Sequence, residues 1–261
     1  MKIGISYYIF SFILLFSLSS CDRIKQKQKH PQSLMSADKS AYTDERGISR
    51  YGDSLDILVP EYEKKQSMIY TLGDYSFYIT AYLNNGEPLL YIENGESNQY
   101  GHITKHYYLH KGKVILFKEN HHNESIDFAY QSEREYFRNN VLFYAESKKG
   151  SNSSDFNAAP YNPVKGVTRD LDSTVSFMTD ALKREGKFNL VLEGITEDSR
   201  VRYIVLSRPG LGTYRTVIRV EKEDEFIREL VSNTEKFIGD KLHLNFDIID
   251  NEAVYKSGSI N

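Results

Sequence analysis

The chain has 261 residues, a single cysteine and a slight acidic excess, with 36 Asp and Glu against 33 Lys and Arg. One cysteine excludes a disulfide scaffold, and a chain without a basic stripe lacks the electrostatic footprint of nucleic-acid-binding proteins. We therefore expect no nucleic-acid partner. Twenty tyrosines and 14 phenylalanines supply ample apolar area for a core and favour β-strands.

The first residues have the three parts of an export signal. Lys2 supplies a positive charge, an apolar stretch follows from Ile3 to Leu18, and small residues end the segment. The run Leu18-Ser19-Ser20-Cys21 resembles the lipobox of bacterial lipoproteins. This resemblance implies that residues 1–20 are a signal peptide.

The same resemblance, which covers residues 1–21, implies that Cys21 carries a diacylglycerol and an N-acyl chain. Each buried lipid CH₂ contributes about 0.8 kcal/mol, so an anchor of two or three chains holds a protein permanently on a membrane. We expect an exported, membrane-anchored lipoprotein, on either the inner or the outer membrane. The alternative is an uncleaved anchor helix, because the apolar run approaches the roughly 18 residues of a spanning segment.

Residues after the lipobox are polar as far as about Arg50 and show no periodic apolar face. We interpret residues 21–50 as a lipidated flexible tether. As a random coil, a segment of this length has a reach of roughly 30 Å.

Residues 51–150 are predicted to form an antiparallel β-meander domain. Three turn signals, Asn85-Gly86, Lys111-Gly112 and Asn139-Asn140, separate short runs rich in tyrosine, phenylalanine and β-branched residues. Such dipeptides accept the positive φ angles that two-residue hairpin turns require. Three successive hairpins favour a single sheet.

A segment rich in Ser, Asn and Pro, from Gly150 to Pro163, is predicted to be a linker or a long surface loop. Beyond it, residues 164–261 are predicted to form an α+β domain, with helices at Asp172–Arg184 and Glu221–Ile238 and five strands around them. The predicted fold class is therefore α+β and β-rich, with an antiparallel meander followed by a smaller α+β unit that has two helices.

The first strands of the meander have two faces. Tyr75, Phe77, Ile79, Ala81 and Leu83 alternate with a second face that contains Tyr78 and Tyr82 and that His106 and Tyr108 continue. A tyrosine ring is apolar with a polar tip, which suits contact with sugars, peptides or proteins. The candidate binding residues are Tyr78, Tyr82, His106 and Tyr108. Alternatively, this face is an ordinary outward-facing surface or packs under the Asp172 helix.

Histidines raise the possibility of a metal site. His102, His106 and His110 recur every four residues, which separates neighbours by about 13 Å on a strand, too far for one ion. The adjacent pair His121 and His122 remains the metal candidate, but a solvated polar loop is the preferred interpretation of it. No cofactor is expected other than the covalent lipid.

Enzyme motifs are absent from the sequence, which has no Gly-x-Ser-x-Gly, no His-Glu-x-x-His and no Walker loop. No catalytic residue is assigned. We expect a non-enzymatic lipoprotein that binds an envelope protein or glycan. An immunity-type protein, which binds a toxin, would be one example of such a lipoprotein. The alternative is an envelope hydrolase with a dispersed, metal-dependent site that uses His121 and His122.

Overall fold

The computed structural model describes residue 42, residues 44–210 and residues 212–260. The chain divides into two units, Met1–Ser40 and Ala41–Asn261, and all the described residues belong to the second. The predicted signal peptide, Cys21 and most of the predicted tether lie outside the described residues.

Helices and strands alternate in the following order along the described chain. The helices are α3 (Glu45–Leu58), α4 (Ser153–Ala158), α5 (Leu171–Lys183), α6 (Glu225–Ser232) and α7 (Thr234–Phe237), with short 3-10 turns η1 (Val59–Glu61) and η2 (Gly186–Phe188). The strands are β1 (Glu63–Gln66), β2 (Tyr70–Leu72), β3 (Tyr75–Asn84), β4 (Glu87–Ser97), β5 (Gly101–His110), β6 (Lys113–His122), β7 (Tyr130–Arg138), β8 (Val141–Gly150), β9 (Asn162–Pro163), β10 (Val191–Asp198), β11 (Val201–Ser207), β12 (Arg215–Val220), β13 (Leu242–Ile249) and β14 (Glu252–Ile260).

One 14-stranded sheet organises the molecule, in the order β10-β11-β12-β2-β3-β4-β5-β6-β7-β8-β9. Strand β1 pairs with β3, and β14 pairs with both β12 and β13. The pairings are antiparallel except for that between β12 and β14. The predicted α+β, β-rich fold class is confirmed.

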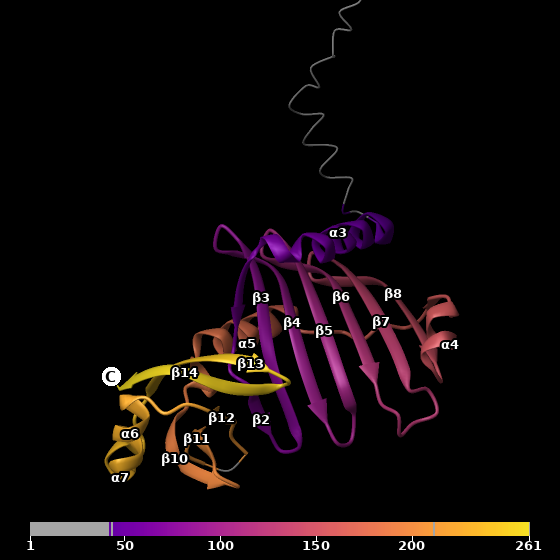
Figure 1. Ribbon diagram of the computed structural model, residues 1–261. Coiled ribbons are helices and arrows are strands. Elements are labelled where there is room, and N and C mark those ends of the chain that lie inside the picture. The colour runs from indigo at the N-terminus through magenta and orange to yellow at the C-terminus, as the bar shows by residue number, and fades with distance from the viewer. Residues whose placement is uncertain (1–41, 43, 211, 261) are drawn as a thin grey trace, which may run out of the picture. The chain divides into compact units, whose positions relative to one another are not determined.

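The meander, β3 to β8, is built on the three predicted two-residue turns (Figure 1). Asn85 and Gly86 have φ angles of 51° and 82°, Lys111 and Gly112 of 52° and 73°, and the two asparagines of the third turn of 52° and 63°. Paired positive φ angles give a hairpin the right-handed twist of its strands. The turn chemistry read from the sequence is therefore confirmed.

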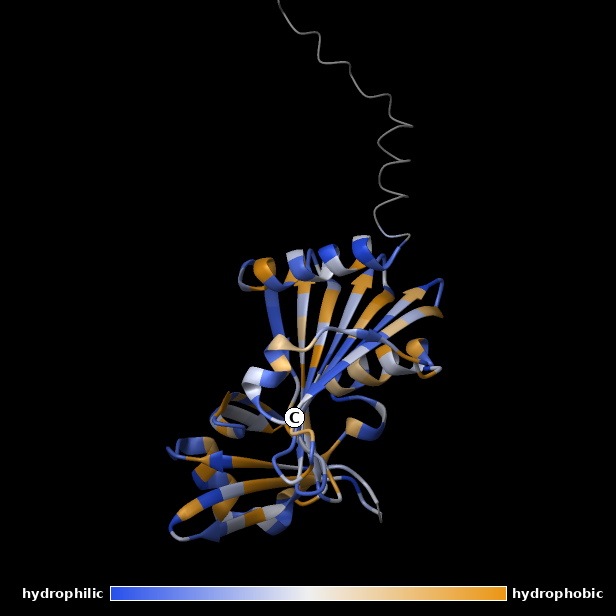
Figure 2. Cartoon of the chain, turned by 90° about the vertical axis from the view of Figure 1, so that its right-hand side faces the viewer, coloured by the Kyte–Doolittle hydropathy of each residue, from blue (hydrophilic) through white to orange (hydrophobic). Residues whose placement is uncertain are grey.

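One face of the meander, here called the back face, carries the main hydrophobic core. Phe77 of β3 stacks on Phe177 of α5 with ring centroids 5.7 Å apart, and Tyr91 contacts Thr179 of the same helix. The Asp172 helix therefore packs on the face opposite to that of Tyr78. Hydrophobic and hydrophilic residues alternate along the strands of the meander in Figure 2, as two-faced strands require.

The opposite face, here called the front face, is partly covered by α3. Ile48 and Leu55 of this helix are buried against four side chains of the meander, which are Leu90, Tyr108, Leu116 and Tyr136. Figure 1 views the front face and shows α3 across one end of the strands. Helix α3 therefore covers one end of this face, and Phe156 of α4 contacts the same face near Tyr130 and Lys148 at the β7 and β8 edge.

The two predicted halves share one sheet and one core. Strand β12 pairs with β2 through Arg215 and Thr71, and Thr216 donates a hydrogen bond to the Ile69 carbonyl at 2.5 Å. The main core combines residues of the meander with residues of α5, β10 to β14, α6 and α7. Residues on both sides of the predicted linker thus belong to the same compact unit.

Two segments without a predicted element contain helices. Residues 45–50, assigned to the tether, form the first turns of α3, which Asp44 begins by accepting a hydrogen bond from the Gly47 N–H at 2.7 Å. The predicted linker contains α4 and β9, and Asn152 caps α4. In both cases the side chain of the residue before the helix accepts a hydrogen bond from a backbone N–H of the first turn, which has no partner within the helix.

The predicted helix Glu221–Ile238 is shorter and broken. Asp224 accepts a hydrogen bond from the Ile227 N–H at 2.9 Å, so α6 begins at Glu225. Asn233 has φ −132° and ψ 33°, which separates α6 from α7. The backbone at Asp224 and Asn233 thus makes the helices shorter than the apolar pattern predicts.

Candidate functional site

A row of polar side chains crosses the front face beside α3. The strand register places six residues side by side across β3 to β8: Tyr78, Asn94, Thr104, Asn120, Ser132 and Lys148. We call this row the polar strip. Strands lie about 4.8 Å apart, so the strip extends for roughly 24 Å. It offers phenol, amide, hydroxyl and ammonium groups and contains no carboxylate.

Charged groups of α3 and β6 form one border of the strip. The Tyr108 hydroxyl donates to Asp56 Oδ1 at 2.8 Å, and Lys118 Nζ lies 3.1 Å from Asp56 Oδ2 and 3.4 Å from Asp53 Oδ1. Lys118 Nζ also lies 4.7 Å from the centroid of the Tyr108 ring. These contacts fix α3 on the sheet, since charge-assisted hydrogen bonds are about twice as strong as neutral ones.

His106 lies next to this border, opposite Lys118 in the register. Burial lowers the pKa of His106 to about 4; Asp56 opposes this effect and Lys118 adds to it. His106 Nδ1 is buried and has no hydrogen-bond partner in the described part of the chain. The imidazole is therefore neutral at pH 7.

Tyr161, from the segment after α4, covers the β7 and β8 end of the strip. Its ring centroid lies 3.9 Å from the Arg134 guanidinium carbon, and its hydroxyl is 2.9 Å from Ser132 Oγ. Lys148 Nζ donates to the Phe156 carbonyl of α4 at 3.1 Å. Ser132 is buried beneath this cover, whereas Asn120 at the middle of the strip is exposed.

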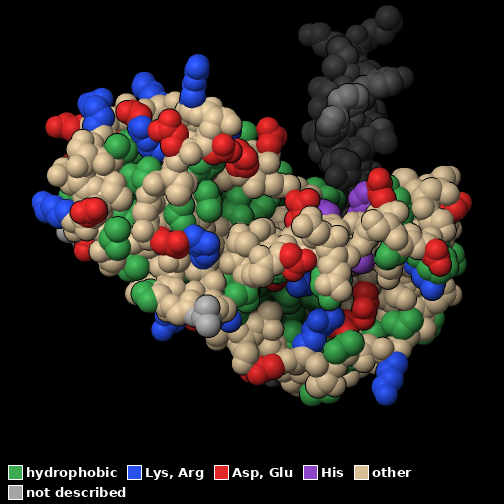
Figure 3. Space-filling model, turned by 90° about the horizontal axis from the view of Figure 1, so that it is seen from below, with side chains coloured by type: hydrophobic (Ala, Val, Ile, Leu, Met, Phe, Trp, Pro, Cys, Tyr) green, Lys and Arg blue, Asp and Glu red, His purple; other side chains and the backbone are tan. Residues whose placement is uncertain are grey.

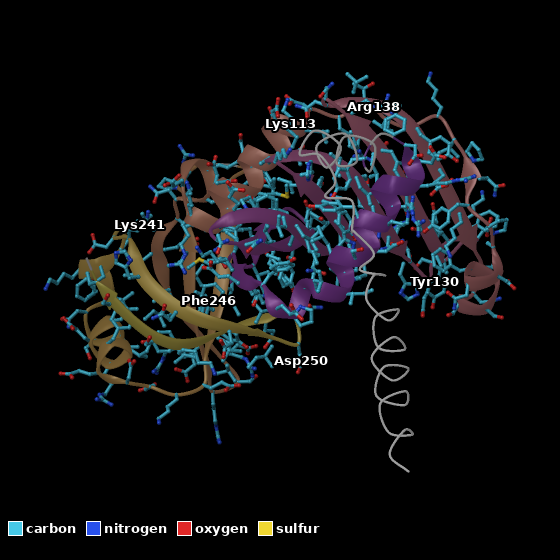
Figure 4. The ribbon with its side chains drawn as sticks, turned by 90° about the horizontal axis from the view of Figure 1, so that it is seen from above. Lys113, Tyr130, Arg138, Lys241, Phe246 and Asp250 are labelled. Atoms are coloured by element: carbon cyan, nitrogen blue, oxygen red, sulfur yellow. The ribbon has the colours of Figure 1, made fainter. Side chains whose placement is uncertain are left out.

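A small pocket lies at the other end of the strip. Tyr78, Asn94 and His102 line it together with Asn251, which belongs to the turn between β13 and β14. The pocket has a volume of about 40 Å³, which is room for one or two water molecules. Asp250 marks the tip of this hairpin in Figure 4.

The four predicted binding residues share the front face but not the same exposure. Tyr78 is partly exposed on the strip, and burial raises its pKa, with a further contribution from Tyr82. Tyr82 packs against the cluster under α3, and His106 is mostly buried. Tyr108 is 1% exposed, so it belongs to the core under α3 and no partner can reach it. Of the four, Tyr78 alone lies on the strip.

The adjacent histidines point to opposite faces of β6. His121 pairs with Ile103 in the register and contacts the Tyr100 carbonyl, whereas His122 pairs with His102 and stacks on Tyr130 with ring centroids 4.4 Å apart. Among the described residues, no group of three or more His, Cys, Asp or Glu side chains is placed to hold a metal ion. The two histidines thus do not converge on one point.

Sequence reasoning missed most of the strip. Asn94 and Asn120 are polar residues at alternating strand positions. A register drawn from the predicted turns alone does not align them with the strip, because a shift of one residue follows the turn in each of these hairpins. Tyr161 carries no such signal, because it reaches the front face from a segment without a predicted element. Its contact with Arg134 depends on the path of the chain after α4.

The strip is suited to binding through neutral hydrogen bonds and aromatic contact. Amides and hydroxyls both donate and accept, and Tyr78 adds a ring near one end. Figure 3 shows the underside of the molecule, where acidic and basic side chains are mixed rather than gathered in a field of one sign.

Comparisons of the chain with protein-family models, curated proteins and solved structures give no match. In the part of the chain that the structure describes, no helix has both the length and the apolar character needed to cross a membrane.

Proposed function

We propose that this protein is a membrane-anchored bacterial lipoprotein of the cell envelope, and that it binds an envelope protein or glycan through the polar strip. The observation that carries the binding role is the open part of the strip, from Tyr78 on β3 to Asn120 on β6. It is a row of hydrogen-bonding groups roughly 14 Å long, by the strand spacing, beside α3 and Tyr161. The lipobox Leu18-Ser19-Ser20-Cys21 supports the location. A toxin neutralised by an immunity lipoprotein would be one protein partner of this kind.

Lipidation has a direct test. Replacing Cys21 by serine is expected to abolish fatty-acid labelling and signal-peptide cleavage in cells, because the thioether requires the cysteine sulfur. Ser20→Ala keeps a small residue before the cleavage site and is expected to be labelled and processed as the wild type is. Normal labelling of the Cys21→Ser variant would contradict the lipid anchor.

Binding through the strip is tested by capture of partners from solubilised membranes and from fragmented envelope glycans. Tyr78→Ala and Asn120→Arg are expected to reduce capture at least tenfold, because one removes a ring and the other places a long side chain across the strip. Lys113→Ala, on the same strand as Asn120 but at the hairpin end, is the matched control. Undiminished capture by both strip variants would remove this face as the binding surface.

A further inference from the structure

A second pocket, which shares no lining residue with the polar strip, lies between β1 and the last hairpin. It has a volume of about 280 Å³, and its lining comes from three elements. Lys64 and Gln66 belong to β1, Leu244, Asn245 and Phe246 belong to β13, and Arg184 follows the last residue of α5. Pockets for small ligands start at about this size.

Arg184 is held in this pocket by its backbone and by β13. Its φ of 58° and ψ of 46° are left-handed, a conformation that usually selects glycine at the end of a helix. Its Nη2 donates to the Leu244 carbonyl at 2.8 Å, and its guanidinium carbon lies 5.6 Å from the centroid of the Phe246 ring. A guanidinium is thus present at a position where the backbone would favour a residue without a side chain.

The pocket is positively charged and its cations lack counter-ions. Neither Arg184 nor Lys64 has a carboxylate oxygen within 4.0 Å among the described residues. Lys241, whose Nζ lies 3.4 Å from the Arg184 carbonyl, adds a third cation close by. Figure 4 shows Lys241 and Phe246 along the same hairpin. Burial lowers the pKa of Arg184, as expected for a half-buried cation without an anionic partner.

We propose that this pocket binds the oxyanion group of a small ligand, a carboxylate, phosphate or sulfate, with Arg184 as its principal contact and Lys64 as its second. A guanidinium presents parallel N–H donors that match the two oxygens of such groups, and Lys64 contributes a point charge. Gln66 and Asn245 also line the pocket. Their amide nitrogens donate to Thr80 Oγ1 at 3.3 Å and to Ser257 Oγ at 2.9 Å, so their amide oxygens are the groups that would accept hydrogen bonds from the rest of the ligand. This site is independent of the polar strip and of the partner proposed for it.

Titration of the full-length protein in detergent tests the site. Calorimetry with sodium phosphate, sodium sulfate and sodium glucuronate, each against sodium chloride at equal ionic strength, is expected to show saturable millimolar binding of at least one anion. The anion that binds most tightly then distinguishes an inorganic oxyanion from an acidic sugar. Failure of all three to saturate at concentrations up to about 50 mM, well above the millimolar class, would overturn the proposal.

Variants identify the contacts. Arg184→Gly removes the guanidinium while suiting the left-handed backbone, so it is expected to fold and to weaken binding at least tenfold. Lys64→Gln is expected to weaken binding about threefold, a loss of the size measured for one exposed charge contact. Lys65→Gln is the matched control, because Lys65 is the next residue of β1, pairs with Glu63 at 3.2 Å and does not line the pocket. Wild-type affinity in the Arg184→Gly variant would exclude this site.

Discussion

Replacing Arg169 by alanine is expected to destabilise the protein by about 3–5 kcal/mol, because it leaves a buried carboxylate without its cation. The side chain of Glu135 is fully buried, and its Oε2 lies 2.5 Å from Arg169 Nε. Its Oε1 accepts a hydrogen bond from the Val167 N–H at 2.8 Å. The guanidinium carbon also lies 4.1 Å from the centroid of the Phe117 ring.

A second carboxyl group lies beside Glu135. Glu133 lies two residues away on the same face of β7, and its pKa is raised by burial and by Glu135. Without Arg169, two neighbouring carboxyl groups would share a poorly hydrated site. The segment from Val167 to Arg169 would also lose its hold on the back face of the meander.

Urea unfolding measures this loss. The matched control is Arg215→Ala, whose partner Glu193 is also on the surface; the two side chains are 55% and 42% exposed. Exposed pairs of this kind contribute less than about 1 kcal/mol. Adding Glu135→Gln to Arg169→Ala is expected to restore part of the stability, since the amide carries no charge. If Arg169→Ala and Arg215→Ala cost the same, the buried pair is not a determinant of stability.

Acidification is expected to destabilise the protein through His106. The pKa of His106 is about 4 in the folded protein, below the ordinary value near 6.5. Between these two pH values the unfolded chain binds more protons than the folded protein, so stability falls as the pH falls. The contribution reaches about 3 kcal/mol by pH 4 and is absent above pH 7.

The measurement is the free energy of unfolding from pH 7.5 to pH 4, compared between wild type and variants. His106→Asn is expected to remove this part of the pH dependence, although carboxyl groups continue to titrate in both proteins. His102→Asn is the control, since His102 lies on the same strand and is exposed. A parallel pH profile for His106→Asn and the wild type would show that burial of this imidazole carries no such cost.

The meander was predictable because its signals are local. Asn85-Gly86, Lys111-Gly112 and Asn139-Asn140 each prescribe a two-residue turn, which pairs the strand ends on either side of it. The sequence did not predict the register shift that follows within a few residues of each turn. The alternation from Tyr75 to Leu83 then assigned the two faces correctly. The placement of Tyr78 on the face opposite to Phe77 follows from these signals alone.

Helix α3 was not predictable from pattern, because its buried side is narrow and contains two glycines. Gly47, Ile48, Gly52 and Leu55 are its buried residues. A Cβ on Gly52 would lie 2.7 Å from Leu116 Cδ2, so the absence of a side chain there allows close packing on the sheet. Glycine lowers helix propensity by about 1 kcal/mol, which conceals the helix from sequence reasoning.

The exposure of the site residues depended on that helix. Tyr108 and Tyr78 have the same alternation and similar neighbours in the sequence, yet α3 buries the first and leaves the second partly open. Sequence reasoning therefore found the correct face and could not divide it into covered and uncovered parts. Contacts between residues far apart in the sequence, such as that of Tyr161 with Arg134, also decide which part of the face is covered.

The pairing of β2 with β12 has a consequence for how this chain folds. The meander is synthesised first, but α5 and β12, which cover its back face and extend its sheet, come later in the chain. Until they arrive, long strands with an apolar face stand uncovered, and such intermediates are prone to aggregate. The core of this protein is therefore complete only when the C-terminal elements α5 to β14 have joined the meander.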